Sequence, residues 1–429
     1  MIDSRRDTLA NGLRVIYLPM PTFHAAIGVV YVRMGPRFET AGENGLSHFV
    51  EHVLFKGTEK HPDPESLSRE IDAIGGELNG ATMPEYTELV VSCHRRHFLR
   101  GLDLLFDVAL CPRFEPQHVE TERAVVLEEM CQYRDVVGHD YSIDELSYEL
   151  MWPRQAHAFS CLGPEGNVQG FTRQQIEAHY RRFLKARGVV VCVAGNFDQA
   201  AVEALIAERF GGLEGGGGVE APALRDEQRG AQCLFRRVRT RMAYLKLCHK
   251  ACSYHDPRLY PVLILSDVLG GGVTSRLFAR LRERDGLVYD VSSNTTLFSD
   301  CGWLDIVTTT SRGKLALAVE ASLEEIRRLA DQGVGEDSLQ SIKDRVACQM
   351  EMLEDSPPDV ADWFGVREIL LAPERLSSPA EEAERLKRVT ADQVRDAAAD
   401  VFRPPRRSLV VVGPSTWGER RKIRGLVER

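Results

Sequence analysis

One helix–strand pattern recurs near the end of each half of the chain. Residues 171–197 (FTRQQIEAHYRRFLKARGVVVCVAGNF) are echoed about 218 residues later by residues 389–415 (VTADQVRDAAADVFRPPRRSLVVVGPS). Both stretches read as a helix followed by a buried strand, and self-similarity of this kind is typical of a duplicated unit. The sequence therefore predicts two related halves.

A glycine-rich stretch separates these halves. Residues 214–227 (EGGGGVEAPALRDE) have the composition of a flexible linker, so we expect one domain over residues 1–213 and a homologous one over residues 228–429. Alternating strands are expected at 26–33 and 86–92, and amphipathic helices at 98–110 and 313–331. This mixture predicts the α+β class.

Residues 48–52 read His-Phe-Val-Glu-His, the H-x-x-E-H order of a zinc peptidase motif. Because a helix turns about 100° per residue, His48, Glu51 and His52 project from one side. Zinc favours neutral imidazole ligands, and Glu51 between them can take a proton from a water whose pKa the metal lowers. The alternative is a solvated helix face. The opposite side is apolar: Leu46, Phe49, Val50, Val53 and Leu54.

A third ligand is expected from the segment 116–134 (PQHVETERAVVLEEMCQYR), which reads as a helix. Glu122 and Glu129 are seven residues apart, nearly two turns, and lie beside the apolar stripe, whereas Glu128 points away. We expect Glu129 to bind the metal and Glu122 to orient a ligand or steer a proton. The alternative is a charged flank. The predicted stripe is Val119, Val126, Met130 and Tyr133.

Together with the surrounding stretch GPRFETAGENGLSHFVEHVLFKGT (35–58), these residues resemble the pitrilysin and insulysin family of zinc peptidases, in its short-chain branch with the mitochondrial processing peptidases. The resemblance covers nearly the whole chain. It implies two halves, each a mostly antiparallel sheet with helices packed on one face. It also implies zinc ligands His48, His52 and Glu129, with Glu51 as general base and Glu122 as the additional catalytic-site glutamate.

The most informative stretch of the second half is residues 269–293 (LGGGVTSRLFARLRERDGLVYDVSS). It lacks the lysine and spacing of a phosphate-binding loop, so a nucleotide site is not expected. The family resemblance implies that Arg282 and Tyr289 contact the substrate and donate hydrogen bonds to the carbonyl oxygen as it gains charge. The alternatives are a surface charge for Arg282 and a core strand position for Tyr289.

The resemblance also implies that peptides bind by adding a strand to a sheet edge. Residues 75–92 (GGELNGATMPEYTELVVS) resemble that edge, with Asn79 at the polar position. Gly80 stands where alanine is more usual, so we expect extra room beside the scissile bond. The alternative is an internal hairpin strand.

Composition points to a cytoplasmic enzyme. No apolar run is long enough to span a bilayer, and the start lacks a signal-peptide core. Ten irregularly spaced cysteines indicate free thiols, and a net charge of −9 disfavours nucleic acid and mildly favours basic peptides. The Cys/His stretch 248–255 is expected to be structural, with Cys248 and His249 on opposite faces of a strand, and His94 and His97 to lie in a basic surface loop.

These residues and the family resemblance predict a zinc metalloendopeptidase that cleaves peptides or unfolded precursor segments. The resemblance further implies an enclosed chamber, formed by a homodimer in which Arg282 and Tyr289 of one subunit face the zinc of the other. Two alternatives stay open. The chain could be the metal-bearing subunit of a heterodimeric processing peptidase, or a non-catalytic scaffold of the same fold.

Overall fold

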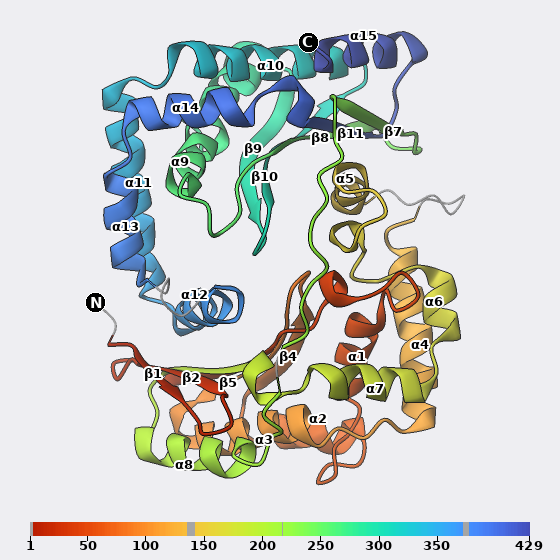
Figure 1. The fold of residues 1–429 in the computed structure, drawn as a ribbon, viewed down its shortest axis with the longest axis vertical. Helices are drawn as coiled ribbons and strands as arrows, with labels where there is room; N and C mark the ends of the chain where they lie inside the picture. Colours follow the sequence, from red (N-terminus) through yellow and green to blue (C-terminus); the bar gives the residue numbers. More distant parts are fainter. Residues whose placement is uncertain (1–2, 135–141, 217, 372–376) are drawn as a thin grey trace. The chain divides into compact units, whose positions relative to one another are not determined.

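The computed structural model describes residues 3–134, 142–216, 218–371 and 377–429 (Figure 1). The chain forms two compact units. Unit 1 comprises Met1–Met130, Phe159–Pro222 and Glu351–Ala380, and unit 2 comprises Cys131–Ala158, Ala223–Met350 and Glu381–Arg429. The described part of the predicted linker, 214–227, contains neither helix nor strand.

Unit 1 is built on a six-stranded sheet in the order β1-β2-β6-β3-β5-β4. Neighbouring strands are antiparallel except for the parallel pair β2 and β6. Strand β4 therefore lies at one edge of the described sheet. The strands are β1 (Arg5–Thr8), β2 (Arg14–Pro19), β3 (Ala25–Val32), β4 (Glu77–Thr82), β5 (Thr87–His94) and β6 (Val189–Gly195).

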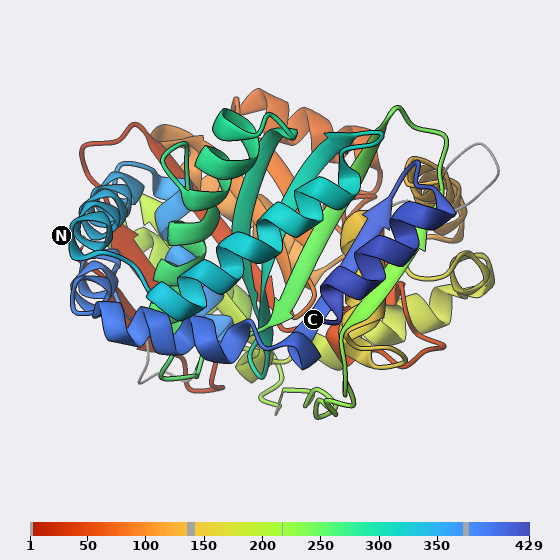
Figure 2. The same cartoon turned by 90° about the horizontal axis from the view of Figure 1, so that it is seen from above.

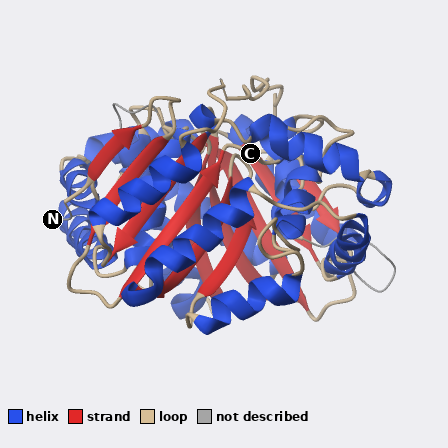
Figure 3. Ribbon diagram, turned by 90° about the horizontal axis from the view of Figure 1, so that it is seen from below, coloured by secondary structure: helices blue, strands red, loops and turns tan. Residues whose placement is uncertain are grey.

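Most helices of unit 1 pack against one face of its sheet, where alternate β3 side chains such as Val30 and Val32 join the main apolar core. Figure 3 shows helices crossing the strands. These helices are α1 (Leu46–Leu54), α2 (Pro64–Ala73), α3 (Phe98–Leu110), α4 (Pro116–Cys131), α6 (Glu165–Gly170), α7 (Arg173–Phe183) and α8 (Gln199–Phe210). The opposite face is covered by α12 (Pro357–Leu370), where the Tyr31 hydroxyl donates to the Ala361 carbonyl at 3.3 Å.

Unit 2 repeats this plan with a five-stranded sheet in the order β7-β11-β8-β10-β9. Only β7 and β11 are parallel. The strands are β7 (Gln232–Arg236), β8 (Met242–Lys250), β9 (Val288–Leu297), β10 (Gly302–Ser311) and β11 (Arg407–Val412).

Figure 2 shows long helices lying across the strands of unit 2. The helices whose side chains join the apolar core of unit 2 are α9 (Leu259–Gly270), α10 (Leu315–Gln332), α11 (Glu336–Leu353), α13 (Pro379–Lys387), α14 (Ala391–Val401) and α15 (Trp417–Val427), with a π-helical turn η5 (Phe278–Arg284). The other sheet face carries α5 (Ile143–Met151), whose Leu146 packs against Val410 and Val412.

The predicted α+β class and the two homologous halves are confirmed. Five strands in each unit share one order and one pattern of orientations, and the helices expected at 98–110 and 313–331 are α3 and α10. One addition concerns α5 and α12. Each covers the second face of a sheet formed mainly by the other half of the chain, so the compact units depart in two segments from the division expected at residues 214–227.

The sulfur chemistry of the chain matches the expectation from cysteine spacing. All ten cysteines are free, and Cys248 and His249 lie on opposite faces of β8. His94 and His97 are exposed.

No described helix is long and apolar enough to cross a membrane.

Candidate metal centre

The start of α1 is fixed by a buried carboxylate. Gly45 precedes the helix with φ 103°, and a Cβ there would lie 2.8 Å from the Leu162 carbonyl oxygen. Gly45 has no side chain to cap the helix, so Glu39 takes that role: its carboxylate accepts from the backbone N–H of Gly45 at 2.9 Å and of Ser47 at 2.7 Å. Glu39 is 3% exposed, so these two hydrogen bonds are shielded from water.

Helix α1 has the two faces that its sequence predicts. The five predicted apolar residues are buried, while His48, Glu51 and His52 are only partly covered. The Glu129 Oε2 atom of α4 lies 3.2 Å from His48 Nε2 and 3.5 Å from His52 Nε2. These three side chains can each offer one ligand atom within 4.8 Å of the others, and two imidazoles with one carboxylate fit a catalytic zinc site.

Helix α4 presents its glutamates as the seven-residue spacing predicts. Glu122 is 2% exposed and Glu129 is partly buried, whereas Glu128 is exposed. Val119, Val126 and Met130 are buried as expected. The placement of Tyr133 in this stripe is wrong, because α4 ends at Cys131 and Tyr133 is 42% exposed.

Behind the ligands, Glu122 holds His52 in orientation. The Glu122 carboxylate lies 3.1 Å from His52 Nδ1 and 2.9 Å from Lys56 Nζ. Since Nδ1–H donates to Glu122, Nε2 is left for a metal. Burial alone would raise the pKa of Glu122, but hydrogen bonds from His52 and Lys56 outweigh it and lower that pKa. Lys56 was missed in the sequence, although it follows His52 by four residues.

The carboxylates also change the pKa of His48. Burial lowers it, but hydrogen bonds to Glu129 and Glu51 outweigh burial and raise the pKa of His48 to about 9. The hydrogen bond from His48 in turn lowers the pKa of Glu129. Glu51 Oε2 lies 3.5 Å from His48 Nδ1. A metal must therefore displace a proton from this cluster when it binds.

The edge strand β4 runs beside α1. Of the predicted edge segment 75–92, only this first part lies at the edge, because the rest enters β5, which pairs with strands on both sides. Asn79 is exposed, and its Oδ1 accepts from the Gly80 backbone N–H at 2.9 Å. The extra room expected at Gly80 is wrong. A Cβ there would lie 2.8 Å from the Phe55 ring and 3.2 Å from Glu51 Cγ, so the Phe55 ring fills the space beside the proposed base.

Arg282 and Tyr289 lie together in unit 2. The Arg282 guanidinium carbon, on the π-helical turn, is 5.1 Å from the centre of the Tyr289 ring on β9. Tyr289 is 79% exposed, so it is not a core strand residue. Both side chains are thus available to a ligand. The π-helical winding could not be read from the sequence.

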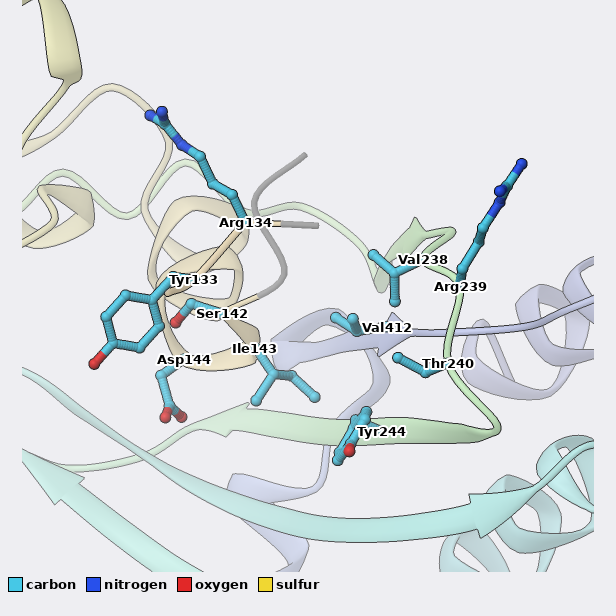
Figure 4. A pocket seen from close by; sticks show the side chains of 10 residues that line it. All are labelled: Tyr133, Arg134, Ser142, Ile143, Asp144, Val238, Arg239, Thr240, Tyr244 and Val412. Carbon is cyan, nitrogen blue, oxygen red and sulfur yellow. The ribbon is translucent and has the colours of Figure 1, made fainter. Parts of the chain in front are cut away.

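A separate cavity of about 600 Å³ lies in unit 2 (Figure 4). Figure 4 shows side chains from the start of α5 and from β11 pointing toward one another inside it. None of the predicted site residues lines it. Its lining residues are Tyr133, Arg134, Ser142, Ile143, Asp144, Val238, Arg239, Thr240, Tyr244 and Val412.

Comparisons with known proteins give matches over most of the chain. Residues 14–164 match the profile of the insulinase family, peptidase family M16, and residues 170–346 match the profile named peptidase M16 inactive domain. An uncharacterized zinc protease of Mycobacterium leprae is 32% identical over 77% of this chain and 74% of its own length. One from Bacillus subtilis is 28% identical over 96% of this chain and 98% of its own length.

Two further similarities extend over nearly the whole chain. The mitochondrial-processing peptidase subunit beta of Blastocladiella emersonii is 27% identical over 95% of this chain and 88% of its own length. The crystal structure of a protease from Helicobacter pylori superposes with a TM-score of 0.86, covering 96% of this chain and all of that one, at 18% identity. This structural likeness concerns the fold.

Proposed function

The chain belongs to peptidase family M16, the insulinase family, and from this premise we propose that it is a zinc-dependent endopeptidase acting on peptides or unfolded precursor segments. The observation that carries the proposal is the convergence of His48 Nε2, His52 Nε2 and Glu129 Oε2 beside Glu51. The names of the relatives, zinc proteases, support zinc as the metal.

Zinc bound by these three residues would make a water more acidic and polarise the peptide carbonyl. Glu51, which lies between the two histidines in the sequence of α1, accepts the proton of the attacking water and passes it to the leaving amine. Glu122 and Lys56 keep His52 in the metal-binding tautomer. Strand β4, with Asn79 and Gly80, offers its free edge to an extended peptide.

Replacement of Glu51 tests this proposal. Glu51→Gln keeps the size of the side chain but cannot accept a proton, so we expect zinc content to stay at the wild-type level while peptide cleavage falls by roughly 10²- to 10⁴-fold. Zinc is measured by elemental analysis, and cleavage by mass spectrometry on a peptide library, which also reports sequence preference. Full peptidase activity in this variant would rule out the assignment.

We further propose that the active assembly is a homodimer, with Arg282 and Tyr289 of one subunit completing the site of the other inside a closed chamber. The exposure of Tyr289 and its stacking with Arg282 support a role in binding. These groups would donate hydrogen bonds to the carbonyl oxygen as it gains negative charge. Ten free thiols are consistent with a cytoplasmic location.

A heterodimeric processing peptidase is the second candidate, because one relative is named as a subunit of such an enzyme. In that case this chain is the metal-bearing subunit, and a related chain is its partner. Native mass measurement of the protein purified alone, followed by a peptide assay, separates the two. An active dimer favours the homodimer, and an inactive monomer favours the heterodimer.

A further inference from the structure

A second group of metal-binding side chains lies in unit 2. Among the described residues, two groups offer three ligand atoms within 4.8 Å of one another: the centre on α1 and α4, and the group His157, Asp300 and Cys301. We propose that His157, Asp300 and Cys301 bind a second zinc ion. The two groups share no residue, so this site does not depend on the peptidase assignment.

Two segments far apart in the sequence supply the ligands. Strands β9 and β10 pair up to Leu297 and Gly302, and the Phe298 N–H donates to the Cys301 carbonyl at 2.8 Å, so Asp300 and Cys301 belong to a tight hairpin turn. His157 lies on the short 3-10 turn Ala156–Ala158 that follows α5. All three residues belong to unit 2.

The side chains of His157 and Cys301 are buried among apolar residues, which favours metal binding by these groups. The His157 side chain is 1% exposed, and its ring centre lies 5.3 Å from that of Trp152 and 6.1 Å from that of Phe298. Cys301 is 8% exposed within the same apolar cluster. A hydrophobic shell excludes water from the ligands. Asp300, one third exposed, leaves one side open to solvent for a fourth ligand.

The geometry parallels that of the first centre. His157 Nε2 lies 3.1 Å from the Asp300 carboxylate, and His48 Nε2 lies 3.2 Å from that of Glu129. The two groups differ in that the second one includes a sulfur atom, from Cys301. Imidazole, carboxylate and thiolate together suit zinc, and binding would release the thiol proton of Cys301. An ion pair alone would account for the His157–Asp300 contact, so the test depends on the Cys301 sulfur.

The ion would tie the β9–β10 hairpin to the segment that follows α5. That segment is already held by Gln155, whose amide exchanges two 2.8 Å hydrogen bonds with the backbone of Arg225. Strand β9 carries Tyr289 toward its other end. The second zinc is therefore a structural cross-link that fixes this strand within unit 2.

Cobalt substitution of the full-length protein tests the site, because Co²⁺ bound to thiolate gives a charge-transfer absorption that the sulfur-free first centre cannot give. We expect the metal-stripped protein to take up two equivalents of Co²⁺, with that absorption present. Cys301→Ser should lose the absorption and one equivalent. His52→Ala should lose one equivalent and keep the absorption. Uptake of a single equivalent without the absorption would overturn the proposal.

Two further variants guard against indirect effects. Cys348→Ser, which removes an exposed thiol, should keep both equivalents and the absorption. Asp300→Asn, at the exposed ligand, should keep the fold but weaken Co²⁺ binding at this site by more than about tenfold. Survival of the absorption in Cys301→Ser, or unchanged Co²⁺ affinity in folded Asp300→Asn, would count against the site.

Discussion

At the scale of single residues, the candidate metal centre rests on groups outside the proposed set of ligands. Glu39 fixes the start of α1, and Glu122 with Lys56 fixes the imidazole of His52. A ligand held in one orientation loses little freedom when the ion binds, which is why outer groups affect metal affinity.

Glu122→Gln should therefore weaken zinc binding. The amide cannot hold His52 Nδ1–H and Lys56 as an ionised carboxylate does, and we expect zinc affinity to fall by about 10- to 100-fold. Competition with a chromogenic chelator measures this affinity. Glu128→Gln on the same helix is the matched control, because Glu128 is exposed, and its affinity should equal that of the wild type. Equal affinities in both variants would refute the orienting role of Glu122.

The residues that sequence could identify are those whose roles follow from helical spacing. His48, His52, Glu122 and Glu129 are placed by counting along two helices, and the structure brings them together. Contacts across the fold could not be counted in this way. The Phe55 ring beside Gly80 and the carboxylate of Glu39 under α1 depend on how separate segments pack.

At the scale of elements, the second face of each sheet is the feature that sequence left undetermined. The repeated stretches 171–197 and 389–415 each predict a buried strand after a helix, and these strands are β6 and β11, both buried along their whole length. The pattern does not say which helix covers which face. Only the fold reveals that α12 lies on β6 and β3, and α5 on β11.

Gly365→Ala tests the close packing of α12. A Cβ at Gly365 would lie 2.1 Å from Cε2 of Tyr31, a buried ring that is tied to α12 through Ala361, so the helix must shift. We expect a loss of about 1–3 kcal/mol in the free energy of unfolding, measured by urea denaturation. Gly425→Ala, whose Cβ meets nothing within 4 Å, should be neutral or stabilising. No difference between these variants would contradict the packing.

Glu88 on β5 makes the packing of α12 against the sheet sensitive to pH. Burial and the nearby Asp362 of α12 raise the pKa of Glu88 from 4.5 to about 7. The folded state then holds a proton that the unfolded state releases, so the contribution of Glu88 to stability is full below about pH 4.5 and is lost as pH rises through about 7.

Glu88→Gln stays uncharged at every pH and should therefore become more stable than the wild type as pH rises. Urea denaturation of both proteins at about pH 5 and about pH 8 measures the difference in their free energies of unfolding. A difference that stays constant, or that shrinks on going to the higher pH, would contradict a raised pKa.

At the scale of the whole molecule, the proposed homodimer makes a prediction about how Arg282 and Tyr289 act. If they complete the site of the other subunit, a mixture of Glu51→Gln and Arg282→Ala should regain activity. Half of randomly mixed dimers are heterodimers with one intact site, which gives about a quarter of the wild-type rate. Native mass spectrometry confirms exchange, and no recovery after exchange would show that the pair acts within its own subunit.

The positions of α5 and α12, each on a sheet formed mainly by the other half of the chain, also constrain how the chain folds during synthesis. Folding during synthesis normally starts from the N-terminal domain. Here the sheet of unit 1 is complete at Gly195, yet its second face stays bare until residues 357–370 have left the ribosome. The helix that covers this apolar face is therefore synthesised more than 160 residues after the last strand of the sheet, so the packing of α12 is a late step in the folding of unit 1.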